Sequence, residues 1–191
     1  MQPEDSLQLS PEESAELLRW SRRVLREFLQ TGRKPTSFDP SSWSPSLLQS
    51  SSVFVTLRRG EELRGCIGDI SGSLPLAEAV ARSTLLAASE DGRFEPVSLA
   101  EEPEIRIELS ILSPFRPVAG PAEVQVGRHG LYLRRQSWSG LLLPQVAAER
   151  GWDAVAFLEH TALKAGLSPE GWMGAELFVF SARVLREEIY G

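Results

Sequence analysis

A short hairpin in the first third of the chain constrains the fold more than any other feature. Residues 53–57 (Val-Phe-Val-Thr-Leu) and 63–67 (Leu-Arg-Gly-Cys-Ile) have the composition of strands, and only a turn at residues 59–62 separates them. Strands joined by so short a turn pair antiparallel, because a parallel pair needs a long crossover connection. The sequence therefore predicts local chain reversals rather than a doubly wound parallel sheet.

Helical patterns precede and follow this hairpin. Ser10, Pro11 and Glu13 form a helix start, with a serine N-cap, a proline in the first turn and a glutamate that closes a capping box. Apolar residues at helical spacing continue this helix to Gln30, and Gly32 is its expected stop. Further helices are predicted over residues 76–89, 145–150 and 153–165, and further strands over 105–111, 123–126, 130–135, 140–143 and 177–185. This mixture indicates an α+β fold with a mainly antiparallel sheet flanked by helices.

Length and charge argue against several classes of protein. The 191 residues suffice for the core of one ordinary domain, of which the first nine residues are expected to fray. A net charge of −6 disfavours general nucleic-acid binding, because basic side chains supply most of that affinity. We expect no signal peptide and no membrane span, since the apolar runs are far shorter than the roughly 20 residues that a bilayer requires. One cysteine cannot form an internal disulfide, and we expect a cytoplasmic location.

That cysteine, Cys66, lies in the segment Leu-Arg-Gly-Cys-Ile-Gly at residues 63–68. Gly65 and Gly68 allow a sharp turn or the close approach of another group. Arg64 could favour the nucleophilic thiolate, in which case Cys66 is a reactive site. Free cysteine is also among the most buried residue types, so a small packing residue in a strand is the alternative. The residues alone leave both interpretations open.

Two further residues are candidates for catalysis beside this thiol. His129 lies between Arg128 and Gly130 in a turn, where it either acts as a general base or caps the turn by hydrogen bonding. Glu108 belongs to an alternating strand and shares one strand face with Arg106 and Ser110. If that face lines a cleft, Glu108 could orient His129 or bind an amine, whereas on a solvent face it is only part of a half-exposed strand.

The candidate binding residues are mostly arginines. Arg64, Arg93 and Arg128 could together hold a carboxylate or phosphate, or they lie separately on the surface. Gln145 follows a proline at a strand-to-helix junction, where it points into a site or caps the turn. Two histidines and one cysteine without a close ligand pair do not indicate a metal site, and no nucleotide or cofactor motif is present. We therefore expect no metal and no cofactor.

Six ordered blocks resemble one family, the AMMECR-type domain, which is the A component of AmmeMemoRadiSam systems. The hallmark is the cysteine segment at residues 63–68, and the other blocks follow in the family's order at residues 91–94, 107–114, 127–131, 140–146 and 157–167. The chain departs from the family pattern at two positions. Ala162 stands where a second cysteine is common, which argues against a mechanism with two thiols, and Gly92 replaces a usual proline.

The resemblance implies a cytosolic α+β domain with a smaller α/β subdomain, and partnership with a Memo-like protein and a radical SAM protein. Two functional hypotheses follow. The first is a thiol-dependent enzyme in which Cys66 is the nucleophile, His129 the base and Glu108 the orienting group, with a small anionic or acyl substrate held by the arginines. The second is a non-catalytic binding or accessory module for those two partners. Nucleic-acid binding is the weakest hypothesis, and we expect contact with neither nucleic acid nor a membrane.

Overall fold

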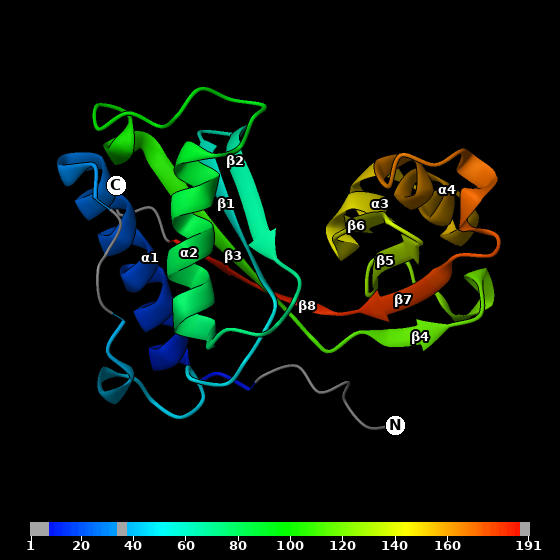
Figure 1. The fold of residues 1–191 in the computed structure, drawn as a ribbon, viewed down its shortest axis with the longest axis horizontal. Helices are drawn as coiled ribbons and strands as arrows, with labels where there is room; N and C mark the ends of the chain where they lie inside the picture. The colour runs from blue at the N-terminus through cyan, green and yellow to red at the C-terminus, as the bar shows by residue number, and fades with distance from the viewer. Residues whose placement is uncertain (1–7, 34–37, 188–191) are drawn as a thin grey trace. The chain divides into compact units, whose positions relative to one another are not determined.

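The computed structural model describes residues 8–33 and 38–187 of the chain (Figure 1). The chain divides into two compact units. Among the described residues, the large unit comprises residues 8–33, 38–112 and 183–187, and the small unit comprises residues 113–182. Most of the N-terminal segment expected to fray lies outside the described residues, but Leu9 is buried in the core of the large unit.

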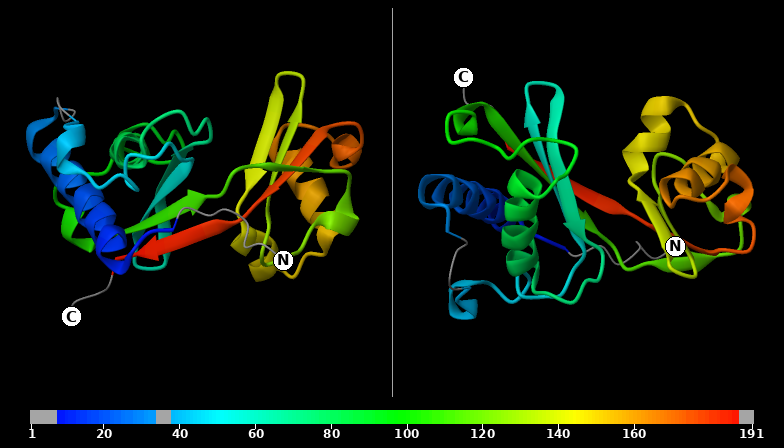
Figure 2. Two further views of the ribbon diagram at one scale, coloured as in Figure 1. Left: turned by 90° about the horizontal axis from the view of Figure 1, so that it is seen from below. Right: turned by 45° about the horizontal axis from the view of Figure 1, so that its top comes forward.

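The large unit consists of two helices on a four-stranded sheet of order β2-β1-β3-β8 (Figures 1 and 2). The hairpin is confirmed, because β1 pairs antiparallel with β2 from Val53 opposite Asp69 to Arg59 opposite Glu62. β1 also pairs antiparallel with β3, which brings residues far apart in sequence onto adjacent strands. The elements are α1 (Pro11–Thr31), β1 (Val53–Arg59), β2 (Glu62–Asp69), α2 (Leu76–Ser89), β3 (Ile105–Leu112) and β8 (Ala182–Arg186), with 3-10 turns at Pro40–Ser42 and Glu102–Glu104.

The predicted ends of α1 are confirmed at both termini. The Ser10 hydroxyl accepts from the Glu13 N–H at 3.1 Å, and the Glu13 carboxylate accepts from the Ser10 N–H at 2.8 Å, which completes the capping box. Gly32 has φ 67° and ends the helix in the left-handed conformation. Since these contacts join residues at most four apart, the sequence pattern alone is sufficient to predict them.

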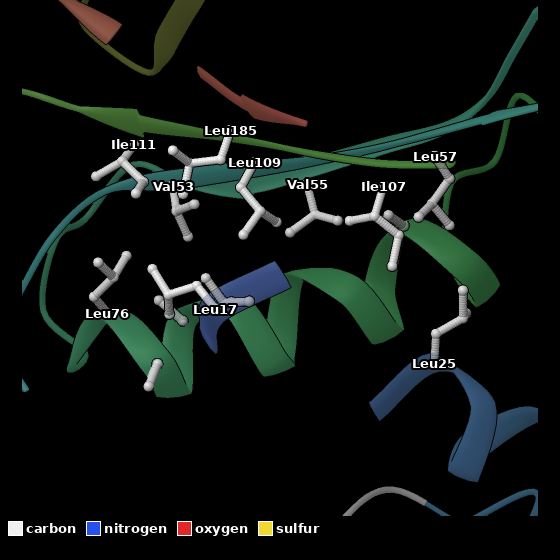
Figure 3. Close-up of a cluster of buried hydrophobic side chains, with 14 of the residues drawn as sticks. Leu17, Leu25, Val53, Val55, Leu57, Leu76, Ile107, Leu109, Ile111 and Leu185 are labelled. Carbon is white, nitrogen blue, oxygen red and sulfur yellow. The ribbon is translucent and has the colours of Figure 1, made fainter. Parts of the chain in front are cut away.

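One face of the large sheet is covered by α1 and α2 and forms the core. Val53, Val55 and Leu57 alternate along β1 and point to the helices, and Ile107, Leu109 and Ile111 of β3 belong to the same cluster (Figure 3). Leu17 and Leu25 of α1 and Leu76 of α2 meet them from below in that view. Each of these side chains is removed from water, which supplies the main driving force for packing the two layers. Within residues 8–33 and 38–187, no helix of this unit covers the opposite sheet face (Figures 1 and 2).

The small unit has its own sheet, of order β4-β7-β5-β6, and its own core. Phe157 and Leu158 of its longer helix pack against Leu131 and Leu133, which alternate along β5. Its elements are β4 (Arg116–Val118), β5 (Gly130–Arg135), β6 (Trp138–Leu142), α3 (Pro144–Arg150), α4 (Ala154–Lys164) and β7 (Glu176–Phe180), with 3-10 turns at Pro121–Glu123 and Pro169–Trp172. Two antiparallel sheets with four helices confirm the α+β fold class.

Two strand predictions are wrong. Residues 123–126 do not form a strand, because the chain enters this segment from a 3-10 turn at Pro121–Glu123 and only Val124 is buried. The predicted strand over residues 177–185 is two strands, β7 and β8, which belong to different sheets and meet at Ser181. Continuous alternation cannot reveal such a transfer, since the alternation of side chains is preserved across it.

Candidate functional site

Arg64 is an extra residue in β2. Its side chain contacts residues 95, 96 and 101 rather than the Cys66 thiol, beside which the sequence suggested a role for it. In the β1–β2 pair Leu57 lies opposite Gly65 and Arg58 opposite Leu63, so Arg64 has no partner and forms a bulge. Its guanidinium pairs with Glu101 (Nε to Oε1, 2.9 Å) and donates to the carbonyl groups of Glu95 and Pro96 at 2.7 and 3.2 Å. Arg64 therefore anchors the segment that connects α2 to β3.

The two glycines of the cysteine segment serve close packing. A Cβ atom at Gly65 would lie 2.1 Å from the carbonyl oxygen of Ala87 in α2, and a Cβ atom at Gly68 would lie 2.5 Å from the ring of Phe54. Both distances are far below ordinary van der Waals contact. Glycine at these positions thus lets α2 and an aromatic ring lie directly against β2.

The Cys66 side chain lies on the sheet face opposite the helices. Its neighbours Gly65 and Ile67 face α2 and the core, and successive residues of a strand point to opposite faces. Cys66 is half-buried, and its sulfur accepts a hydrogen bond from the Thr56 hydroxyl at 3.3 Å. Thr56 is in turn directly opposite Glu108 on β3.

These residues continue to the fourth strand and form a polar row across the large sheet. The Glu108 carboxylate accepts from Arg186 Nε of β8 at 2.6 Å. We call Cys66, Thr56, Glu108 and Arg186, one from each strand, the thiol row. Thr56 and Glu108 are only 5% and 9% exposed, so the row places a hydroxyl and a carboxylate where a sheet would ordinarily bury apolar side chains. Ser110 of the same face is also buried, and Arg106 is exposed.

Asp91 and Arg93 bind the backbone of Cys66 from outside the sheet. The Cys66 N–H donates to Asp91 Oδ2 at 2.8 Å, and Arg93 Nη2 donates to the Cys66 carbonyl oxygen at 3.4 Å. Arg93 also forms an ion pair with Asp91 at 2.7 Å. Because β2 is an outer strand, this pair satisfies backbone groups that would otherwise be unpaired. Arg93 therefore holds the cysteine strand in place.

The remaining candidates belong to the small unit. His129 is 1% exposed, and its ring Nδ1 accepts from the Gln125 backbone N–H at 3.1 Å. The backbone N–H of His129 donates to the Gln125 carbonyl oxygen at 2.8 Å. This geometry is that of a turn-capping histidine. Arg128 is exposed and donates to Gln125 Oε1 at 3.3 Å, and Gln145 is a half-buried residue in the first turn of α3. The proposed Cys66, His129 and Glu108 constellation thus draws on both units, and only Cys66 and Glu108 share a unit and a sheet face.

The sequence did not single out Thr56, Asp91 or Arg186. Thr56 was hidden in an ordinary strand pattern, and Arg186 is more than a hundred residues from Cys66 along the chain. Asp91 stood in one of the six blocks, but nothing in its spacing indicated a bond to Cys66. Its polar position immediately after a buried helix is the one signal that could have drawn attention to it.

No metal or membrane assignment follows from the structure. Within residues 8–33 and 38–187, no group of three or more His, Cys, Asp or Glu side chains is arranged to hold a metal ion. In the same residues no helix combines the length and the apolar character needed to cross a bilayer.

The six blocks and the two-unit fold agree with one known family. The sequence profile named AMMECR1 matches residues 18–185. This chain belongs to the AMMECR1 family. The match begins in α1 and ends in β8, so Thr56, Cys66 and Glu108 of the thiol row lie within it and Arg186 lies one residue beyond its end.

Relatives within the AMMECR1 family support the same conclusion. Protein MK0488 of Methanopyrus kandleri is 41% identical, over 94% of this chain and 91% of that protein. Protein PF1979 of Pyrococcus furiosus is 40% identical, over 90% of this chain and 87% of that protein. The crystal structure of the uncharacterized protein PH0010 from Pyrococcus horikoshii is similar with a TM-score of 0.87 at 38% identity, and the match covers 94% of each chain. These likenesses show the AMMECR1 family and its fold.

Acidification is expected to destabilise the protein through two carboxylates near the cysteine strand. The hydrogen bonds from Arg93 lower the pKa of Asp91 from 3.8 to about 2, and those from Arg64 lower the pKa of Glu101 from 4.5 to about 2. Both groups stabilise the folded state when ionised, so their contribution is complete above pH 4.5 and is lost as the pH falls toward 2. Urea unfolding at about pH 6 and about pH 3 measures this loss.

The variant Asp91→Asn provides the comparison for this pH dependence. It is expected to be less stable than the wild type near neutral pH, and to lose less additional stability on acidification, because one of the two titrating carboxylates is gone. If the variant and the wild type lose the same free energy of unfolding between the two pH values, Asp91 does not carry the effect.

Proposed function

We propose that this AMMECR1-family chain is a cytosolic binding component that works with a Memo-like protein and a radical SAM protein, and that the thiol row contacts their substrate or their side chains. The observation that carries this proposal is the row itself, which crosses four strands on the face opposite the helices. The family resemblance supports the choice of partners.

The chemistry of the row suits recognition of a polar group. It offers a hydroxyl, a carboxylate and a guanidinium within one line, and therefore both donors and acceptors. Glu108 is nearly buried and Arg186 is exposed, with 67% of its side-chain surface accessible. An incoming amine can replace Arg186 on the carboxylate, or an incoming carboxylate can bind the guanidinium.

Thiol-dependent chemistry is the second candidate, and one contact favours it. The Thr56 hydroxyl donates to the sulfur at 3.3 Å, and such a donor stabilises negative charge on a sulfur atom. The structure around the thiol supports this candidate less than the first. Arg64 and Arg93 are engaged with Glu101 and Asp91, and both histidines of the chain belong to the small unit.

Retention of the two partner proteins tests the first candidate. The tagged wild-type chain is expected to co-purify with a Memo-like protein and a radical SAM protein from the same host. Glu108→Gln should weaken this retention by about tenfold or more, since a hydrogen bond to a charged group contributes about 1.5–3 kcal/mol. The control Glu176→Gln alters an exposed ion pair of the small unit and should bind as the wild type does. Equal retention by both variants, or no complex with the wild type, would refute the proposal.

Two substitutions of the cysteine separate the candidates. Cys66→Ser keeps a small polar side chain but removes the nucleophilic sulfur, and Cys66→Ala removes both properties. If the chain only binds, Cys66→Ser should complement a deletion strain and return it to the wild-type phenotype. A thiol-dependent enzyme should fail to complement in both variants. Thermal unfolding of each variant checks that the strand remains folded.

A further inference from the structure

A groove runs along α1 in the large unit, beside the outer strand β8. It has a volume of about 1350 Å³. It is lined by α1 residues from Pro11 to Gln30, by residues 184–187, and by Gly60 and residues 103–106. At 1.5 Å per residue this stretch of helix measures about 28 Å. An extended peptide of about eight residues has the same length, whereas a small metabolite would fill only part of it.

The edge of β8 at this groove offers free backbone groups. The Glu187 N–H donates to the Ile107 carbonyl oxygen of β3 at 3.1 Å, so odd-numbered residues of this strand face β3. The backbone groups of Ala182, Val184 and Arg186 therefore point outward, and no described residue makes a backbone hydrogen bond to them. An unpaired edge of this kind accepts an additional strand.

The groove is basic, although the whole chain carries a net charge of −6. Its lining contains six arginines and three glutamates. Arg22, Arg26 and Arg186 are paired with glutamates of the large unit. Arg19, Arg23 and Arg106 form no ion pair with any residue that the structure describes, and Arg23 lies over the Trp20 ring at 4.6 Å.

The polarity of the lining changes along the groove. Pro11, Ala15 and Leu18 line it near the start of α1, next to Val184, and arginines dominate beyond Leu18. The contact of Arg183 with the Leu9 carbonyl group and of Arg22 with Glu187 shows that β8 and α1 run in the same direction here. The apolar end of the groove therefore lies beside the start of β8 and the basic end beside its finish.

We propose that this groove binds an extended acidic segment of a partner protein, which adds to the large sheet as a fifth strand beside β8. Backbone hydrogen bonds to Val184 and Arg186 provide its alignment, and Arg19, Arg23 and Arg106 bind its acidic side chains. The groove shares only Arg186 with the thiol row. The proposal does not depend on the function proposed for that row.

A defined peptide tests the proposal on the full chain. The probe is a fluorescein-labelled ten-residue peptide in which Glu alternates with Val and Thr, and the matched probe carries Lys in place of Glu. Fluorescence anisotropy at low salt should detect binding of the acidic peptide only, and added salt should weaken it. The double variant Arg19→Ala/Arg106→Ala should weaken binding by about tenfold or more. Arg82→Ala, at an exposed arginine of α2 outside the groove, should have no effect.

Two measurements test the added strand separately from charge attraction. Val184→Pro removes an outward N–H from an outer strand, where proline is tolerated, and should abolish peptide binding while the chain stays folded by thermal unfolding. Amide hydrogen exchange of the wild type should show new protection at Val184 and Arg186 when the acidic peptide is bound. Absence of binding, binding without this protection, or equal binding of the Lys peptide would overturn the proposal. Displacement of the bound peptide by a single-stranded oligonucleotide would also overturn it, because the groove would then bind polyanions in general.

Discussion

Replacing Gly65 with alanine is expected to destabilise the protein by about 3 kcal/mol, at the upper end of the usual range for overpacking. The new Cβ atom would lie 2.1 Å from the Ala87 carbonyl oxygen and 3.1 Å from its carbon. Both are backbone atoms of α2, so no side-chain rotation can relieve the contact, and the helix must move away from β2. For a protein of this size the loss corresponds to a fall in Tm of roughly 6–12 °C.

Gly92→Ala is the matched control for this prediction. A Cβ atom at Gly92 would meet no heavy atom within 4 Å, and its backbone does not require the left-handed conformation. Its stability should therefore stay within about 0.5 kcal/mol of the wild type. Thermal unfolding followed by circular dichroism compares the two variants. Similar Tm values for both would show that the close approach of α2 to β2 is not what Gly65 permits.

Glu102→Gln is expected to cost about 3 kcal/mol, because it removes a buried negative charge from two arginines. The Glu102 side chain is 7% exposed and accepts from Arg22 at 3.0 Å and from Arg26 at 3.2 Å. Burial opposes the charge on Arg22, but Glu187 and Glu102 outweigh it and raise the Arg22 pKa. Without the Glu102 carboxylate the Arg22 guanidinium keeps its positive charge and loses one of the two negative charges that balance it. Urea unfolding at neutral pH measures the effect.

Two controls test whether the loss of stability comes from leaving the buried Arg22 charge unpaired, rather than from the loss of any ion pair. One control is an exposed ion pair and the other is a double variant. Arg134 and Glu176 are 2.8 Å apart but 52% and 58% exposed, so Glu176→Gln should change stability by less than about 1 kcal/mol. In the double variant Arg22→Met/Glu102→Gln the uncompensated charge is removed. Its loss of stability should be smaller than the sum of the two single losses. Additive losses would contradict the explanation by an unpaired buried charge.

Much of the secondary structure was predictable because its determinants are local. The capping box of Ser10 and Glu13 and the stop at Gly32 involve residues at most four apart, and α2 was predicted at residues 76–89, where the structure has it. β4 was missed, since three residues that include Pro117 carry almost no strand signal. The strand over residues 177–185 was wrong for a different reason: the chain passes from one sheet to another at Ser181 without a break in alternation.

The candidate site was predicted only in part. Cys66 and Glu108 were singled out, and they do share a face of one sheet. The roles suggested for Arg64 and Arg93 depended on their proximity to the thiol, yet a bulge turns Arg64 toward Glu101, and Arg93 binds Asp91. The Arg64 contact could not be read from spacing, because Glu101 lies 37 residues further along the chain. Asp91 is only two residues before Arg93, but nothing in that spacing showed that the pair also binds the backbone of Cys66.

The sequence by itself determined the hairpin, the helix ends, the α+β class and the family of this chain, since each rests on short-range periodicity, caps or ordered motifs. Only the tertiary structure decided that Thr56 and Arg186 complete the row that begins at Cys66, and that arginines of α1 line a groove at the edge of β8. The physical reason is that side-chain alternation repeats every two residues on every strand. It specifies which residues share a face, while strand order and register decide which of them meet.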